Sequence, residues 1–488
     1  MAKITTIIDI GSNSMRMVVF KKTSRFAFHL INESKSKVKI SEGCYENGGN
    51  LQEQPMNRAF EALKSFLKIS KNLKSRKILC VATSALRDAP NKKIFINKVS
   101  KELKLNIKII DGTKEAYYGG VAALNLIADD NFTTLDIGGG STEFAFVNDK
   151  NITKTISLKI GTVRIQELFF NKNDLDGAKD YIESQLRTIE EDIDTIVALG
   201  GSARALSRII LQKENYPLES LHGFKYDVKD NLKLFQTIID TTDTKELKAL
   251  GVQKDRYDTI GVGTFIFKTI LEYFGIKKVI TSSAGVREGV YLTDLLRTSN
   301  HKFPSNFNLS VRSLLDRFVD DETQSGYLGN NAKKIFDTLA PIHNLDNKYR
   351  SLLVIASKLQ LIGISLSFDK NEDHAFWYII NGLTYDFTHQ DKILIAIITK
   401  FTKKSLPRDS DIEKFKELLP NIEIIRWLNF MVTLNSSLNC EFTKTKYDYN
   451  LEKDTLKIVS KVDQYLVKRA LKKVKTPFKL NIEYKISN

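Results

Sequence analysis

Apolar residues follow two alternating patterns over the first 130 residues. Short apolar runs typical of buried strands occur at residues 4–10, 15–20, 26–32, 36–41, 78–82 and 107–110. Apolar positions at helical spacing predict helices at residues 56–73, 92–103 and 113–126. Strands interspersed with helices in this way predict an α/β fold.

The pattern then starts again. Strands are predicted at residues 133–137, 143–147, 152–160, 195–199 and 278–281, with a helix at 174–190 and further helices up to about 274. Residues 9–20 (DIGSNSMRMVVF) align with residues 136–147 (DIGGGSTEFAFV), sharing the Asp, the Ile, the first Gly and the Ser. We interpret this as two related halves, each presenting a Gly/Ser turn toward a shared cleft.

The pattern of apolar residues changes after residue 297 and becomes mostly helical. Residues 309–380 are mostly helical in pattern, and residues 424–437 predict another helix. Residues 440–460 predict a hairpin, and a basic helix at 462–475 and a final strand follow. The predicted domains are residues 1–124, 125–297 and 298–488, the last a helical region with a small α/β tail.

Composition narrows the class of protein. Of 488 residues, 42% are hydrophobic and 27% charged, as in soluble globular proteins. The three cysteines, Cys44, Cys80 and Cys440, lack CxxC spacing, which argues against a disulfide scaffold and favours a reducing cytosol. No apolar run approaches the roughly 20 residues that span a bilayer, and the N-terminus does not resemble a signal peptide. We expect a cytoplasmic protein without membrane contact.

The formal net charge of +16 is unevenly distributed. The first 100 residues carry about +12 and residues 101–200 about −6, and the tail after residue 450 is basic again. A Lys-rich composition with solvated faces accounts for such a pattern, and so does a polyanionic partner such as nucleic acid, a membrane surface or a phosphate-rich substrate.

Both Gly/Ser turns can bind an anion, because backbone N–H groups in a tight turn point toward one place and glycine leaves room for close approach. The turn residues are Gly11, Ser12, Asn13 and Ser14 in the first half and Gly138, Gly139, Gly140, Ser141 and Thr142 in the second. One such turn alone is often only structural. Two matched turns, each after an aspartate at a strand end, predict a two-part phosphate clamp.

Charged residues beside the turns suggest further chemistry. Bare carboxylates at Asp9 and Asp136 would repel phosphate, which a Mg²⁺ between them would prevent, and Glu143 could reach the same ion. Arg87 ends a strand, where its guanidinium could hold phosphate in fork geometry. Other arginines just beyond Gly-containing or polar turns are Arg16, Arg204 and Arg287, each of which could also be an ordinary surface residue.

Six motifs in order identify a family resemblance. They are 9–14 (DIGSNS), 82–87 (ATSALR), 111–116 (DGTKEA), 136–143 (DIGGGSTE), 199–204 (LGGSAR) and 285–289 (GVREG). The set resembles the exopolyphosphatase / guanosine pentaphosphate phosphohydrolase family of the actin–Hsp70–hexokinase superfamily, over about 60% of the chain. The resemblance implies duplicated ribonuclease-H-like domains with the active site between them.

The resemblance also implies Mg²⁺-dependent removal of the terminal phosphate from inorganic polyphosphate or pppGpp, with Mn²⁺ as a possible replacement. By motif, Glu115 is the catalytic base, and Asp136 and Glu143 assist metal binding. The two turns and Arg87 bind phosphate. Family members usually have two glutamates before the alanine of the third motif; here the first is Lys114, which leaves Glu115 as the candidate.

Longer family members carry a C-terminal region that resembles an HD-type hydrolase. Residues 356–363 (ASKLQLIG) have Gln360 and Leu361 where such domains have His-Asp. Since a metal site needs those ligands, we expect a degenerate HD-like region without catalysis, which could still bind substrate or form a homodimer interface.

The sequence does not decide between several possible functions. Polyphosphate and pppGpp present the same terminal phosphoanhydride. The chain could be primarily a pppGpp phosphohydrolase active in the stringent response, or an alarmone sensor that binds ppGpp with little turnover. A kinase or ATPase of the same superfamily would bind adenine near Gly200 and Gly201. A nucleic-acid binder ranks third, because no RRM-like or KH-like signature is present.

Overall fold

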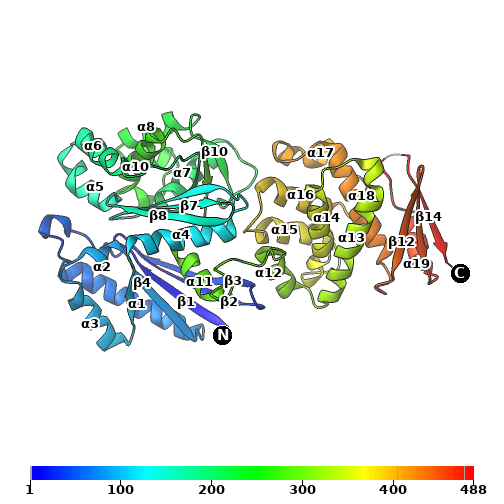
Figure 1. Ribbon diagram of the computed structural model, residues 1–488, viewed down its shortest axis with the longest axis horizontal. Helices are drawn as coiled ribbons and strands as arrows, with labels where there is room; N and C mark the ends of the chain where they lie inside the picture. The colour runs from blue at the N-terminus through cyan, green and yellow to red at the C-terminus, as the bar shows by residue number, and fades with distance from the viewer. Residues whose placement is uncertain (1–2, 404, 478, 488) are drawn as a thin grey trace. The chain divides into compact units, whose positions relative to one another are not determined.

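The computed structural model describes residues 3–403, 405–477 and 479–487. It divides into two compact units, Met1–Phe307 and Asn308–Asn488. The first unit contains two sheets with their helices, and the second is mostly helical and ends in a small sheet (Figure 1). The predicted boundary at residue 124 falls inside a helix that links the two halves of the first unit.

The sheet of the first half has the strand order β3-β2-β1-β4-β5. Its strands are β1 (Ile4–Ile10), β2 (Met15–Lys22), β3 (Phe28–Ser36), β4 (Lys77–Ala82) and β5 (Ile107–Ile109). Strand β1 pairs antiparallel with β2 and parallel with β4. Its alternate residues Ile8 and Ile10 are fully buried in a core that also takes side chains from α1 (Glu53–Asn72) and α3 (Lys92–Leu103).

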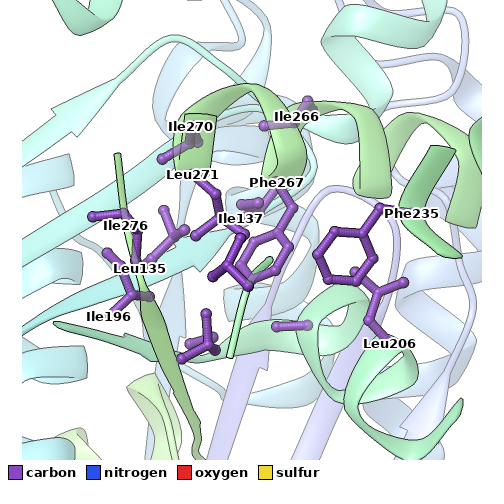
Figure 2. Close-up of a cluster of buried hydrophobic side chains, with 14 of the residues drawn as sticks. Leu135, Ile137, Ile196, Leu206, Phe235, Ile266, Phe267, Ile270, Leu271 and Ile276 are labelled. Atoms are coloured by element: carbon purple, nitrogen blue, oxygen red, sulfur yellow. The ribbon is translucent and has the colours of Figure 1, made fainter. Parts of the chain in front are cut away.

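The sheet of the second half has the order β10-β11-β9-β6-β7-β8. Its strands are β6 (Phe132–Ile137), β7 (Thr142–Asn148), β8 (Asn151–Leu158), β9 (Thr195–Ala198), β10 (Lys225–Asp227) and β11 (Lys278–Thr281). Apart from the edge strand β10, the topology repeats that of the first sheet, which confirms the internal repeat. Its core, shown in Figure 2, joins Leu135 and Ile196 of the sheet to Phe235 of α8 (Leu232–Asp240) and Phe267 of α10 (Ile260–Tyr273).

Three sequence predictions need correction in this unit. Residues 36–41 do not form a strand: Lys39 has a φ of +46°, and its N–H donates to the Asn13 carbonyl at 2.9 Å. The Ser41 N–H likewise donates to the Ser12 carbonyl at 3.2 Å, so this segment supports the first Gly/Ser turn instead. Strand β10 and helix α5 (Thr162–Leu168) were not predicted, and the helix expected at 174–190 ends earlier, as α6 (Leu175–Leu186).

The two halves exchange helices. Helix α4 (Gly112–Leu126) comes from the first half, yet its buried Leu124 packs with Val147 and Val197 of the second sheet. Helix α11 (Val286–Leu295) comes from the second half, yet the ring of its Tyr291 stacks on Phe20 of the first sheet with centroids 4.5 Å apart. The helices lie between the two sheets in Figure 1. This exchange ties the halves together behind the cleft.

The C-terminal unit consists of packed helices and a three-stranded sheet of order β12-β13-β14, in which the last strand, β14, is Asn481–Ile486. Its principal helices are α12 (Leu309–Phe318), α13 (Glu322–His343), α14 (Lys348–Leu359), α15 (Asn371–Gly382), α16 (His389–Lys400) and α18 (Ile422–Leu438). The expected hairpin is present as β12 (Tyr447–Glu452) and β13 (Thr455–Ser460), and the basic helix is shorter than expected, as α19 (Tyr465–Leu471). Across the described residues, no helix combines the length and apolar character that a membrane crossing requires.

These observations confirm the predicted fold class. The first unit is α/β and consists of duplicated ribonuclease-H-like halves, each with the strand order 3-2-1-4-5. A mostly helical C-terminal region follows it.

Candidate active site

A cavity of about 140 Å³ opens between the two halves of the first unit, where the Gly/Ser turns meet. Most of the residues that the sequence singles out line it. They are Asp9, Gly11, Ser12, Asn13, Ser14, Arg16, Glu115, Asp136, Gly138, Gly139, Glu143, Arg204 and Arg287. Residues more than 270 positions apart therefore share one small site.

The two turns lie directly against one another. Each connects the first two strands of its half, β1 to β2 and β6 to β7. A Cβ placed on Gly139 would lie 2.7 Å from the Cβ of Ser12, so only glycine permits this approach. The Ser12 hydroxyl lies 3.1 Å from the Ser84 hydroxyl, which fixes the first turn from the side of β4. The predicted two-part arrangement of the turns is therefore present.

The halves differ in charge at one matched position. In the first half Asp9 stands opposite Arg16 in the β1–β2 pairing, and in the second half Asp136 stands opposite Glu143 in the β6–β7 pairing. Both partners lie seven residues after their aspartate. The first pair is a carboxylate with a guanidinium, whereas the second is two carboxylates, so the cleft has an acidic side and a basic side.

Burial governs the protonation of the acidic side. Burial, together with the neighbouring Asp136, raises the pKa of Asp9 to about 6 and that of Glu143 to about 8. Burial also raises the pKa of Asp136. The Glu115 carboxyl has a pKa well above its ordinary value, because it is buried and close to Glu143, although Arg87 acts in the opposite direction. Burial therefore outweighs the nearby arginines, and a further cation in the cleft would stabilise the charged forms of these groups.

The basic side of the cleft is formed by Arg16, Arg204 and Arg287. Burial and the neighbouring Arg16 and Arg287 lower the pKa of Arg204 to about 9. Arg287 is only 6% exposed and donates from Nη1 to Glu33 Oε1 at 2.9 Å. Arg204 donates from Nη1 to the backbone carbonyl of Ser283 at 3.1 Å. Three converging guanidiniums at the cleft wall favour a bound polyanion.

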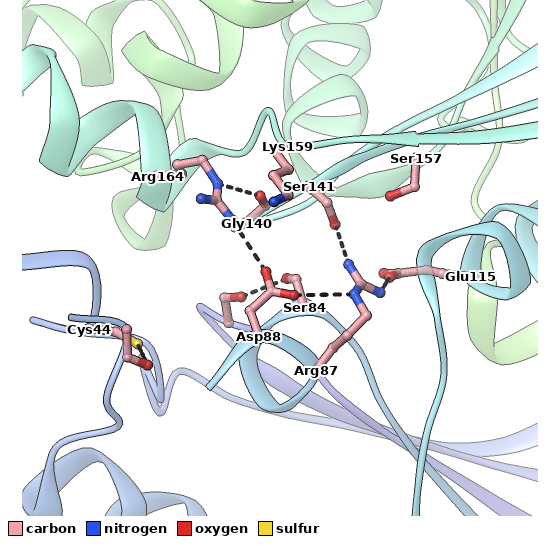
Figure 3. Close-up of polar contacts among 12 residues, drawn as sticks. Cys44, Ser84, Arg87, Asp88, Glu115, Gly140, Ser141, Ser157, Lys159 and Arg164 are labelled. Carbon is pink, nitrogen blue, oxygen red and sulfur yellow. Dashed lines mark hydrogen bonds and ion pairs between the residues drawn. The ribbon is translucent and has the colours of Figure 1, made fainter. Parts of the chain in front are cut away.

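Glu115 is positioned by the start of helix α4. The Asp111 side chain caps this helix by accepting from the Lys114 N–H at 2.7 Å, which places Glu115 in the first turn. Arg87 Nη1 donates to Glu115 Oε2 at 3.0 Å, and Arg87 Nη2 donates to the Ser141 hydroxyl at 3.2 Å (Figure 3). Arg87 thus joins the candidate base to the second turn.

Four predicted site residues do not line the cavity: Arg87, Gly140, Ser141 and Thr142. Arg87 and Ser141 bond to each other beside it. The Gly140 carbonyl accepts from Arg164 Nε at 2.9 Å, a contact that Figure 3 also shows. Thr142 is fully buried, and its hydroxyl donates to the Ile160 carbonyl at 2.7 Å. These residues hold the turn rather than face the open space.

Sequence reasoning missed Arg256, Thr162 and Thr259, which also line the cavity. Arg256 ends a short helical turn, η3 (Lys254–Arg256), that belongs to none of the six sequence motifs, although its guanidinium packs against Gly201. Ion pairs tie this segment across the cleft to the first half, from Lys35 to Asp255 at 2.6 Å and from Lys37 to Asp258 at 2.8 Å. In the sequence, the alternating Lys35, Lys37 and Lys39 were the one sign that this segment forms ion pairs. The sequence alone does not show which acidic residues pair with these lysines.

The donor groups suit a hard cation shared with substrate. Among the described residues no group of three or more His, Cys, Asp or Glu side chains is arranged to hold a metal ion by itself. However, Asp9 Oδ1 is buried without a hydrogen-bond partner, and the cleft also contains Asp136 and Glu143. Mg²⁺ is usually bound by one or two carboxylates together with phosphate oxygens and water. The residues present fit that mode.

Paired anion-binding turns, buried carboxylates and converging arginines are typical of enzymes that act on phosphoryl groups. The chain belongs to the Ppx/GppA phosphatase family. Residues 18–298 match the Ppx/GppA phosphatase family model, and residues 308–476 match Ppx/GppA phosphatase domain III. The resemblance seen in the sequence is therefore confirmed.

Solved structures show the same architecture. The family member from Aquifex aeolicus is 28% identical, covers 61% of this chain and 99% of its own, and superposes with a TM-score of 0.52. An exopolyphosphatase from Cytophaga hutchinsonii is 23% identical, covers 60% of this chain and 97% of its own, and has a TM-score of 0.56, which supports the fold.

A bifunctional 3-dehydroquinate synthase/phosphatase from Fusobacterium nucleatum subsp. nucleatum is 35% identical over 298 residues, which are 56% of this chain. The chain spans less than half of that curated relative, 44% of its length.

Proposed function

We propose that the chain is an exopolyphosphatase that hydrolyses the terminal phosphoanhydride of inorganic polyphosphate and also converts pppGpp to ppGpp. The observation that carries this proposal is the contact between the two Gly/Ser turns, with Glu115 lining the same cavity. Backbone N–H groups of both turns can hold one terminal phosphate from two sides. Such a phosphate would lie between the acidic and the basic side of the cleft.

The reaction needs a base and stabilisation of the leaving chain. Glu115 accepts a proton from water as the water oxygen bonds to the terminal phosphorus, and the bond to the bridging oxygen breaks. The products are orthophosphate and a chain shortened by one residue, or ppGpp from pppGpp. Arg16, Arg204 and Arg287, which line the cavity, would stabilise negative charge on the leaving phosphates. Arg87 orients the Glu115 carboxylate through their hydrogen bond.

We further propose that Asp136, Glu143 and Asp9 hold Mg²⁺, or Mn²⁺ in its place, when substrate binds. The bound ion would neutralise phosphoryl oxygens that the turns hold. The unpaired Asp9 Oδ1 and the three raised carboxylate pKa values support this assignment, since a cation would stabilise all of these groups.

The proposal is tested by measuring orthophosphate release from long-chain polyphosphate, pppGpp and ATP, with Mg²⁺ and with a chelator. We expect release from polyphosphate and pppGpp that requires the metal, with kcat/KM for each deciding which is preferred. ADP formed from ATP in preference to release from polyphosphate would favour a kinase or ATPase instead. Tight ppGpp binding without phosphate release would favour a sensor.

Two accessory proposals accompany this function. The free thiols of Cys44, Cys80 and Cys440 suit a reducing cytoplasm, where we place the reaction. A homodimer stays a prediction from the family, and a single monomeric mass in light scattering would contradict it.

A further inference from the structure

The C-terminal unit carries a short helix that none of the chemistry proposed above uses. Helix α19 is labelled near β12 and β14, toward the C-terminus, in Figure 1. Its inner side is fixed: Val467 is fully buried, and the Lys468 ammonium lies 5.7 Å from the centre of the Tyr484 ring in β14. The Glu441 carboxylate caps its first turn by accepting from the Leu466 N–H at 2.9 Å. The helix is therefore anchored on one side, and its other side faces solvent.

The outward side of α19 is strongly cationic. Residues 461–475 contain six Lys and Arg side chains and a single acid, Asp463, which pairs with Lys468 at 2.5 Å. The other five cations are exposed, and no residue that the structure describes forms an ion pair with them: Lys461, Arg469, Lys472, Lys473 and Lys475. Positions three and four apart share one face of a helix, so Arg469 and Lys473 lie opposite the buried Val467. The open face of the helix therefore presents positive charge to an anionic partner.

Apolar side chains are exposed within the same surface. Val462 is 54%, Tyr465 69% and Leu466 53% exposed. The Val462 carbonyl accepts from the Tyr484 hydroxyl at 2.8 Å, so the turn before the helix is held in place. The Arg469 guanidinium lies 5.7 Å from the centre of the Tyr465 ring. One exposed apolar residue is ordinary on a protein surface, but these three, bordered by the five cations, form a small amphipathic surface. We call these eight side chains the tail patch.

The composition of the tail patch selects among anionic partners. A single-stranded nucleic acid or a polyphosphate chain would use the cations, and a base could stack on Tyr465, but both would leave Val462 and Leu466 in water. The interface of an anionic bilayer accommodates both kinds of group. Lys and Arg bind its lipid phosphates, while Leu, Val and Tyr side chains enter the boundary between headgroups and acyl chains. An anionic lipid surface is therefore the partner that the whole patch fits.

We propose that the tail patch attaches the C-terminal unit to the surface of an anionic lipid bilayer. The cations draw the unit to the headgroups, and Val462, Tyr465 and Leu466 insert at the boundary. Surface attachment requires no spanning helix, so it agrees with the lack of one among the described residues. It replaces the expectation of no membrane contact, which considered only segments long enough to cross a bilayer. The attachment does not depend on the phosphatase activity.

The test is co-sedimentation of the full chain with lipid vesicles at low salt. We expect at least about tenfold stronger binding to vesicles of phosphatidylglycerol and phosphatidylcholine than to phosphatidylcholine alone. About 0.5 M NaCl should release the chain, because the charges are screened. Lys472→Glu/Lys473→Glu should weaken binding at least about tenfold. The matched control, Lys414→Glu/Lys416→Glu, changes the net charge equally at two exposed lysines of the same unit and should bind nearly as the wild type does.

A second pair of variants separates lipid from nucleic acid. Leu466→Ser should bind anionic vesicles several-fold more weakly, because an inserted apolar side chain is lost, whereas Leu175→Ser, at an exposed leucine of α6, should bind normally. Glu115→Gln should also bind vesicles with unchanged affinity. No sedimentation with anionic vesicles, equal sedimentation with both kinds of vesicle, wild-type binding by Leu466→Ser, or tighter binding to poly(U) RNA than to anionic vesicles would each overturn the proposal.

Discussion

At the scale of single residues, one charge difference between duplicated halves organises the cleft. Asp9 faces Arg16, and Asp136 faces Glu143, at matched positions of two strand pairs. The first arrangement favours an anion and the second a cation. A phosphate group with a bound metal ion can interact favourably with both residue pairs. The two halves share a fold, but the ligand that binds between them does not have to be symmetric.

The acidic side leads to a prediction about pH. Burial raises the pKa of Glu143 to about 8 from an ordinary value of 4.5, so the folded state holds this proton more tightly than the unfolded state. The free energy of unfolding should therefore fall as pH rises from about 4.5 through 8 in metal-free protein. Glu143→Gln should make this decline shallower, as measured by thermal unfolding between pH 5 and 9.

The control is Glu102→Gln, an exposed carboxyl on α3, which should keep the wild-type slope. An equally steep loss of stability in Glu143→Gln and wild type would show that the Glu143 carboxyl does not titrate as described. Glu115 titrates in the same direction, so part of the slope should persist in the variant.

Much of the site was predictable at this scale, because tight turns depend on a few adjacent residues. The residues from Gly11 to Ser14 have a local signature wherever they occur. Arg256 has none, since its segment is held at the cleft by ion pairs of Asp255 and Asp258 with lysines more than 200 positions away. The guanidinium of Arg87 was expected on phosphate, but its hydrogen bond to Glu115 requires two helices to meet, α2 (Ser84–Asp88) and α4.

At the scale of elements, the exchange of α4 and α11 holds the halves in register. Each helix packs on the sheet of the other half, and the two helices cross at Gly289. Glu115 lies on one of these helices and Arg287 on the other. The crossing therefore sets the distance between the candidate base and Arg287.

Replacing Gly289 with alanine should destabilise the first unit. A Cβ there would lie 1.8 Å from the Tyr118 backbone carbonyl oxygen, so the helices must separate. We expect the free energy of unfolding to fall by about 1–3 kcal/mol or more, measured by chemical denaturation. Gly261→Ala in α10 is the control, since its Cβ would meet no atom closer than 3.9 Å. Equal stability of both variants would contradict the tight crossing.

Element types followed from sequence wherever apolar periodicity was strong. Strands β1 and β11 and helix α3 have the predicted bounds, because each has a continuous apolar pattern. The strand predicted at 36–41 was wrong, since its alternating lysines serve ion pairs and its backbone bonds to the first turn. The helix exchange was not predictable, because periodicity shows that a helix has a buried face but not which sheet covers it.

At the scale of the whole molecule, the net charge of +16 is unevenly distributed along the chain. The first 100 residues carry most of the excess, while the acidic stretch that follows contains Glu115, Asp136 and Glu143. Under the proposed function, we expect long polyphosphate to extend from the cleft over the basic first half, whereas a short chain would fill only the cleft.

This arrangement predicts that salt weakens binding of long chains more than of short ones. Between about 50 and 200 mM NaCl, KM for long polyphosphate should rise at least about tenfold, because many exposed contacts are screened. KM for tripolyphosphate should rise much less, since its contacts are buried. Identical salt responses in steady-state assays of both substrates would contradict a basic track outside the cleft.

The most direct test of the proposed function is the rate of phosphate release by Glu115→Gln. This variant keeps the size and hydrogen-bonding ability of the side chain but cannot accept the proton of the attacking water. We predict a kcat for polyphosphate lowered by about 10²- to 10⁴-fold with unchanged circular dichroism, while the exposed-site control Glu102→Gln retains full activity. Turnover of Glu115→Gln near the wild-type rate would contradict the assignment of Glu115 as the base.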